Sequence, residues 1–165
     1  MVALGFLDLE QGHYSNGAAA STFLAGRTPA DLRPVLRFWD LVSYPAWAQL
    51  EPALRGRWAP QQLSPRLREV FSAGVEALTA GPAQVLAAVY DFTAHRRLLD
   101  VGGGTGSITA AIARRHLQIQ ATVLERAEVV PLAQRASRPR TCGPGSGRWL
   151  ATPSKGPTRQ ATTSC

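Results

Sequence analysis

The sequence predicts an α/β chain in three parts: a helical region over residues 1–95, the first half of a parallel sheet over residues 96–135, and a disordered basic tail over residues 136–165. Three observations predict this arrangement. Apolar residues recur at helical spacing in the first part, a strand–glycine turn–helix–strand pattern fills the second, and the third changes abruptly in composition. The length of 165 residues fits one domain of roughly 100–200 residues, or part of a larger one.

The composition excludes several classes of protein. Hydrophobic residues make up 45% and charged residues 18% of the chain, which is typical of neither a disordered polyelectrolyte nor a membrane protein. The start of the chain lacks the basic segment and cleavage site of a signal peptide. Two cysteines are too few for a disulfide scaffold or a four-cysteine metal site. We therefore expect a cytoplasmic protein with no bound metal and no contact with a membrane.

The first part is expected to be helical throughout. Residues 1–28 resemble the end of an apolar helix, a polar turn and a short helix. Thr28 is the expected N-cap of the next helix, with Pro29 at its first position and Asp31 in its positive first turn. Because the chain starts inside an apolar element without a capping residue, we expect the natural N-terminus to lie upstream.

Two further helices are expected from Ser43 and from Ser64. The pair Gly81-Pro82 is expected to end the second of these, and a shorter helix is expected over residues 83–90. Three tryptophans that are close together in sequence favour core or dimer packing over an aromatic ligand box. They are Trp39, Trp47 and Trp58.

The second part predicts a β-α-β unit. Residues 98–101 are apolar enough for a strand that is buried on both faces of a parallel sheet. The second strand is expected over residues 121–124 and ends at Glu125. A helix between parallel strands predicts a right-handed crossover. The residues that give this helix its packing stripe are Ile108, Ala111, Ile112 and Ala113.

The glycine turn between the first strand and the helix is the motif that carries chemistry. Glycines there allow positive φ and a close approach of a ligand to the backbone, at the edge of the sheet where open α/β folds bind ligands. The dinucleotide pattern G-x-G-x-x-G that starts at Gly102 needs a glycine at position 107, which is Ser107. A phosphate loop would need Gly-Lys-Ser/Thr, which is also missing.

Acidic residues at the two strand ends narrow the class of ligand. Asp100 stands directly before the turn, where a carboxylate is unfavourable for a pyrophosphate but favourable for an ammonium group. Glu125, at the end of the second strand, could accept hydrogen bonds from both hydroxyls of a ribose. An amine and a ribose without a phosphate together describe S-adenosylmethionine.

Residues 29–134 resemble the S-adenosylmethionine-dependent small-molecule O-methyltransferases of bacteria and plants. The most specific segment is LLDVGGGTGS, which looks like the first cofactor motif of the family. The segment GVEALTAGPAQVLAAVYDF looks like the helix pair that precedes this motif in bacterial members. The segment LGFLDLEQGHYSNGAAASTFLAG looks like the end of their winged-helix dimerisation domain.

The resemblance implies roles for residues of the turn. Asp100 would hold the amino end of the cofactor and Glu125 its ribose, while Arg126 and Ala127 depart from the apolar-Pro pair that the family has after the acid. It further implies a Rossmann-like methyltransferase sheet, a small-molecule methyl acceptor and a homodimer through the N-terminal helices. The glycines that would line the cofactor are Gly102, Gly103, Gly104 and Gly106.

The family pattern stops after Gln134. Members continue with a third strand, a Gly-Asp-aromatic loop, four more strands and a histidine that acts as general base. None of these follows here, so we expect an incomplete chain, truncated at both ends, with the tail as the out-of-frame translation of the missing half. The first strand would then lack its other neighbour in the sheet. We assign no catalytic role to His13, His95 or His116, and we expect His95 and His116 on the surface.

The formal net charge of +7 is concentrated in the tail. Residues 136–165 hold five of the 18 Lys and Arg and none of the 11 Asp and Glu, so residues 1–135 carry 13 cations against 11 anions, a net charge of +2. Two alternatives to an O-methyltransferase therefore remain. One is a fragment that binds the cofactor without catalysis, and the other is a nucleic-acid-binding protein that uses the basic tail.

Overall fold

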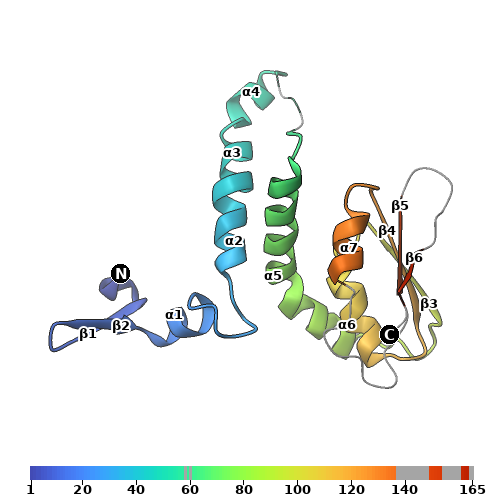
Figure 1. Ribbon diagram of the computed structural model, residues 1–165, viewed down its shortest axis with the longest axis horizontal. Coiled ribbons are helices and arrows are strands. Elements are labelled where there is room, and N and C mark those ends of the chain that lie inside the picture. The colour runs from blue at the N-terminus through green and yellow to red at the C-terminus, as the bar shows by residue number, and fades with distance from the viewer. Residues whose placement is uncertain (58, 60, 137–148, 154–160, 164–165) are drawn as a thin grey trace. The chain divides into compact units, whose positions relative to one another are not determined.

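The computed structural model describes residues 1–57, 59, 61–136, 149–153 and 161–163, and Figure 1 labels its elements. The chain divides into two compact units, Met1–Leu78 and Thr79–Cys165. Helix α5 (Pro65–Val89) contributes its first part to one unit and its last part to the other.

The first unit begins with a β-hairpin and not with the expected end of a helix. A short 3-10 helix, η1 (Val2–Leu4), leads into strands β1 (Leu7–Glu10) and β2 (His13–Asn16), which pair antiparallel. The short helix α1 (Ala18–Phe23) then follows, as the sequence predicts. The prediction that residues 1–95 are all helical is therefore wrong at this hairpin.

The turn of this hairpin gives the reason for the error. Glu10 lies opposite His13, so the loop has only two residues, Gln11 and Gly12, whose φ angles are 50° and 79°. A type I′ turn needs positive φ at both of its central residues. The Gln-Gly pair meets that need, although glutamine is not one of the residues by which such turns are usually recognised.

The next helix begins at Arg33 and not just after Thr28. Helix α2 (Arg33–Phe38) is followed directly by a π-helical turn, η2 (Trp39–Ser43), and by α3 (Tyr44–Trp47), before the short helix α4 (Leu50–Leu54). The residues at both junctions have right-handed helical φ and ψ. The expectation that a new helix starts at Ser43 is therefore wrong, because that residue lies within a continuous helical path.

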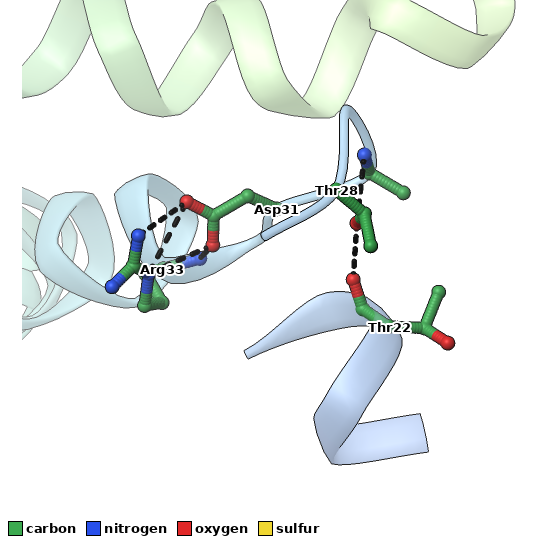
Figure 2. Close-up of polar contacts among 5 residues, drawn as sticks. Thr22, Thr28, Asp31 and Arg33 are labelled. Carbon is green, nitrogen blue, oxygen red and sulfur yellow. Dashed lines mark hydrogen bonds and ion pairs between the residues drawn. The ribbon is translucent and has the colours of Figure 1, made fainter. Parts of the chain in front are cut away.

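Thr28 stabilises the loop before α2, whereas Asp31 accepts a hydrogen bond from the first residue of that helix (Figure 2). The Thr28 hydroxyl donates to the carbonyl of Thr22 and accepts the N–H of Ala30. Asp31 Oδ1 accepts the N–H of Arg33 at 3.1 Å, and Arg33 Nη2 donates to Asp31 Oδ2 at 3.0 Å. These hydrogen bonds from Arg33 hold the pKa of Asp31 below its ordinary value.

Helix α2 packs closely on the first part of α5. The rings of Phe38 and Phe71 meet edge to face, with centroids 5.5 Å apart. A Cβ at Gly74 would lie 2.3 Å from the Cβ of Phe38, so this approach of the two helices requires glycine. Val35 and Val42 are the buried apolar side chains of the helical path that starts with α2.

The two described tryptophans of the first unit are not part of its core. Trp39 is 44% exposed and Trp47 is 67% exposed. The prediction that these tryptophans pack in the core of one chain is therefore wrong for both. Trp58 lies outside the described residues. Burial of the two described tryptophans in a dimer stays a prediction.

Helix α5 continues through Gly81 and Pro82, where the sequence predicts a break. Proline removes one hydrogen bond from a helix interior and usually kinks or ends the helix. Here Ala83 and Ala87, which follow it, are buried in the core of the second unit. The packing of these two small side chains in the core therefore outweighs the tendency of Pro82 to end the helix.

The second unit is built on the sheet of strands β3 to β6 that Figure 1 labels. The strands of this sheet are hydrogen-bonded in the order β3-β4-β5-β6. Strands β3 (Arg97–Val101) and β4 (Gln120–Glu125) are parallel and flank helix α6 (Ser107–Arg115), which confirms the predicted β-α-β unit. Helix α7 (Val130–Ala136) follows β4. The core below this sheet includes Phe92, Ile119 and Val123 together with the predicted stripe residues Ala111 and Ile112, and Ile108 packs against it.

The strand β3 is not buried on both faces, contrary to the prediction. Leu98 packs on the core, but Leu99 is 60% exposed and Val101 is 71% exposed. Among the described strands only β4 pairs with β3, so its other edge is free. The side chains that point away from the core are exposed because no described element covers that face of the strand.

The tail contains two short strands in place of continuous disorder. Strand β5 (Trp149–Pro153) pairs parallel with β4, and β6 (Ala161–Thr163) pairs antiparallel with β5. The rest of the predicted disordered segment, with Cys142 and Cys165, lies outside the described residues. In the described part of the chain, no helix has the length and apolar character needed to cross a membrane.

The contact between Gly26 and Arg33 can be tested by the variant Gly26→Ala. Gly26 has φ +69°, and a Cβ there would lie 1.7 Å from Arg33 Nη2. The guanidinium must therefore move away, so we expect the pKa of Asp31 to rise towards its ordinary value in an NMR titration. Gly56→Ala is the control, because Gly56 also has φ +69° but nothing within 4 Å. It carries the same backbone strain of about 1–2 kcal/mol and should leave the pKa of Asp31 unchanged. An unchanged pKa in both variants contradicts the contact.

Candidate functional site

The turn between β3 and α6 has the backbone conformation that the sequence predicts. Gly102, Gly104 and Gly106 have φ angles of 72°, 58° and 78°, in the left-handed region that other residues rarely adopt. A Cβ at Gly102 or Gly104 would meet no atom within 4 Å. The backbone at these two glycines is therefore open to a ligand.

Gly103 is needed for a different reason. A Cβ on this residue would lie 2.5 Å from the Cγ and from the Oδ2 of Asp100. The carboxylate therefore occupies the space that a side chain at position 103 would need. The backbone of the turn therefore lies directly against the Asp100 carboxylate, so this side chain from β3 contributes to the site at the turn.

Thr109 holds the carboxylate of Asp100 in place. Its hydroxyl donates to Asp100 Oδ2 at 2.5 Å, and its side chain is fully buried in α6. Among the described residues, no group donates a hydrogen bond to the other oxygen, Oδ1. Asp100 therefore has a fixed carboxylate with one oxygen available as an acceptor.

The carboxylate of Glu125 joins the end of β4 to the turn. Its Oε2 accepts the N–H of Gly104 at 2.9 Å, and its Oε1 accepts the N–H of Arg126 at 2.7 Å. The N–H of Gly102 also donates to the carbonyl of Leu124 at 2.7 Å. Each carboxylate oxygen can accept two hydrogen bonds, so Glu125 keeps one free acceptor position on each oxygen.

The structure brings together all six residues that the sequence singles out as a cofactor site. The two acids come from the ends of neighbouring parallel strands, and the four glycines lie in the turn between them. Helix α6 begins at the end of this turn, and the first N–H groups of a helix have no partner within it. The arrangement offers two carboxylates and an open backbone, which suits a ligand with an ammonium group and hydroxyls.

Sequence reasoning missed Thr109. A signal was present, because Thr109 is a polar residue within the otherwise apolar stripe of α6, and buried polar residues need a partner. Sequence alone could not identify that partner as Asp100. The expectation of surface positions for two histidines holds for His95 but not for His116, which is half-buried and bonds to the carbonyl of Ala87 at 2.8 Å.

No histidine of the chain belongs to the turn. His13 lies in β2, His95 precedes β3, and His116 follows the last residue of α6. In the part of the chain that the structure describes, no group of three or more His, Cys, Asp or Glu side chains could hold a metal ion. The site therefore has acceptors for a ligand, and none of the three histidines is placed beside them as a general base.

Comparisons with known proteins agree on one family. A family model described as an O-methyltransferase domain matches residues 53–142, more than half of the chain. The 8-O-methyl transferase TcmO of tetracenomycin polyketide synthesis in Streptomyces glaucescens is 31% identical over 144 residues. This match covers 81% of the present chain and 42% of the relative, so the chain spans less than half of the length of that relative.

Solved structures share the fold. Human N-acetylserotonin methyltransferase in complex with SAM aligns with a TM-score of 0.74 at 18% identity, over 93% of this chain and 48% of that one. PigF with SAH aligns with a TM-score of 0.67 at 26% identity, over 82% of this chain and 44% of that one.

A double-mutant cycle tests the hydrogen bond between Thr109 and Asp100. Thr109→Val keeps the shape of the side chain and removes the donor, and Asp100→Ala removes the acceptor. A hydrogen bond to a charged group contributes about 1.5–3 kcal/mol, so the free energies of unfolding should couple by at least about 1 kcal/mol. Thr109→Val combined with Asp91→Ala is the control pair and should be additive. Additivity in both pairs would mean that the two groups do not interact.

Proposed function

Because the chain belongs to the O-methyltransferase domain family, we propose that it is the cofactor-binding part of an S-adenosylmethionine-dependent O-methyltransferase. One observation carries this proposal. Two carboxylates, each with free acceptor positions, flank a glycine turn whose backbone is open. Neither of the two acids forms an ion pair with a described residue, which favours a ligand that is positively charged and carries no phosphate.

The residues of the turn have separate roles in the proposed site. Asp100 holds the ammonium group of the methionine part through its free Oδ1, in the orientation that Thr109 fixes. Glu125 accepts hydrogen bonds from the ribose hydroxyls at the positions that its two backbone donors leave free. Gly102 and Gly104 allow the ligand to lie against the backbone.

The proposed reaction is a methyl transfer to a hydroxyl group. When bound, the cofactor supplies an electrophilic methyl group on a positively charged sulfur. The contribution of this part of the chain is positioning, because a fixed geometry converts the encounter of two reactants into a reaction within one complex. We propose a small aromatic hydroxyl compound as the acceptor, since the relatives include a 3-hydroxy-5-methyl-1-naphthoate 3-O-methyltransferase of Streptomyces sahachiroi, 29% identical over 141 residues.

The proposed domain organisation follows the sequence boundaries. Residues 1–95 serve as dimerisation and connector region, residues 96–135 bind the cofactor, and residues 136–165 are a basic tail. A hairpin before α1 supports the proposal that the chain starts with the end of a winged-helix domain. The exposed side chains of Trp47 and Leu54 support a homodimer through the first unit. The proposed cofactor and acceptor are small molecules, in keeping with the predicted cytoplasmic location.

A second candidate is a chain that binds the cofactor without catalysis. The observation in its favour is that none of the three histidines lies at the turn. The two candidates differ in one measurement. Both predict binding of S-adenosylmethionine, but only the first predicts transfer of a labelled methyl group from it to a hydroxynaphthoate.

Binding of S-adenosylmethionine by calorimetry tests the proposed site. Glu125→Ala removes both ribose acceptors and the partner of the Gly104 N–H, so we expect Kd to rise at least about tenfold, which corresponds to about 1.4 kcal/mol. Glu125→Gln keeps one acceptor oxygen and should give an intermediate Kd. Glu51→Ala is the control, because Glu51 is an exposed acid in an ion pair with Arg55. No heat with the unaltered chain, or equal Kd values for Glu125→Ala and Glu51→Ala, would sink the proposal.

A further inference from the structure

A pocket of about 290 Å³ lies in the second unit, at the opposite end of β3 from the glycine turn. Arg97 and Leu98, the first two residues of β3, line it, whereas the turn follows Val101 at the other end of the strand. With a rise of about 3.3 Å per residue, the two ends of β3 are more than a side chain's length apart. The proposed cofactor site does not use this pocket.

The floor of the pocket is the hydrophobic core itself. Phe92 and Ile119 are buried core residues, and Leu98 packs against the same cluster. Leu86, from the end of α5, is 40% exposed and adds an apolar surface at the rim. Because core side chains are closely packed and keep their rotamers, this apolar floor is present before any ligand arrives.

One wall of the pocket is a fixed aromatic pair. The rings of Tyr90 and His95 are stacked, with centroids 5.7 Å apart at an interplanar angle of 20°, and Tyr90 Oη lies 3.0 Å from His95 Nε2. Phe92 meets Tyr90 edge to face at 4.6 Å between centroids. Flat rings that are held in this way form a surface on which another planar ring can stack.

The loop that carries this wall is held by its own hydrogen bonds. Asp91 Oδ1 accepts the N–H of Thr93 at 2.9 Å and the hydroxyl of Thr93 at 2.6 Å, and these bonds keep the pKa of Asp91 below its ordinary value. The N–H of His95 donates to the carbonyl of Phe92 at 3.0 Å. The carboxylate of Asp91 is thus engaged within the loop and does not line the pocket.

The charged group of the pocket is Arg97. No carboxylate among the described residues forms an ion pair with its guanidinium, and no acid lines the pocket. A guanidinium binds a carboxylate through two parallel hydrogen bonds. An apolar floor, an aromatic wall and an arginine in the lining together favour a ligand with a planar apolar body and one carboxylate.

We propose that this pocket is a second ligand site, which binds a small aromatic carboxylate. Its ring lies on the floor formed by Leu98 and Ile119 and against the pair Tyr90–His95, and its carboxylate bonds to Arg97. The site is independent of the proposed cofactor site and does not require methyl transfer. The volume is near the lower end of the range of roughly 300–1,000 Å³ for small-molecule sites, so the ligand has one or two rings.

The test uses 2-naphthoate as the probe and 2-naphthamide, which has the same shape without the charge, as its control. Backbone amide shifts of the full chain are followed by NMR during titration. We expect 2-naphthoate to move the signals of Arg97, Leu98 and Ile119 with a Kd of about 0.1–1 mM, and 2-naphthamide to bind at least about tenfold more weakly. Equal binding of the two probes would mean that Arg97 does not bind the carboxylate, and it would overturn the proposal.

A pair of neighbouring arginines supplies the matched variants. Arg97→Gln should raise the Kd for 2-naphthoate at least about tenfold and leave that for 2-naphthamide unchanged, because only the carboxylate uses the guanidinium. Arg96→Gln removes the same charge one residue earlier, outside the pocket lining, and should change neither Kd by more than about twofold. Equal effects of the two variants, absence of binding, or shifts at residues 102–106 in place of the pocket would each overturn the proposal. Binding of S-adenosylmethionine is measured separately, so failure at one site leaves the other to be judged on its own result.

Discussion

The carboxylate of Glu125 is the group on which the geometry of the site depends. The turn after β3 has three residues with positive φ, and such a segment has no regular hydrogen-bond pattern of its own. Within the turn the N–H of Gly106 donates to the carbonyl of Gly103, whereas the N–H groups of Gly102 and Gly104 donate to Leu124 and Glu125 at the end of β4. The end of β4 thus both fixes the conformation of the turn and supplies the carboxylate oxygens that could accept hydrogen bonds from a ligand. A change at Glu125 would therefore affect both.

The second unit could be predicted from sequence to a large extent. The strands expected over residues 98–101 and 121–124 differ from the observed β3 and β4 by no more than one residue at each end. Glycine spacing and an apolar stripe are local signals, and they fix the order strand, turn and helix. The six site residues lie together because parallel strands end at the same edge of a sheet. This follows from the strand topology alone and does not depend on specific side-chain contacts between distant residues.

The remaining features depend on contacts between residues that are distant in sequence, or on unusual local chemistry. Helix α5 passes Pro82 because Ala83 and Ala87 pack in a core that sequence did not place around them. The exposure of Leu99 depends on what covers the outer face of β3, which the strand's own residues do not specify. Thr109 was recognisable as polar and helical, but its partner Asp100 lies in a different element.

Neighbouring glycines of the turn are restricted by two unrelated properties. Gly102 and Gly104 have room for the Cβ of an L-residue but adopt a positive φ, so an L-alanine there is strained by the backbone conformation alone. At Gly103 the limit is volume, because the Asp100 carboxylate fills the position of a Cβ. An L-alanine is therefore unfavourable at all three positions for different reasons: the cost at Gly102 and Gly104 is conformational, and the cost at Gly103 is the displacement of the Asp100 carboxylate.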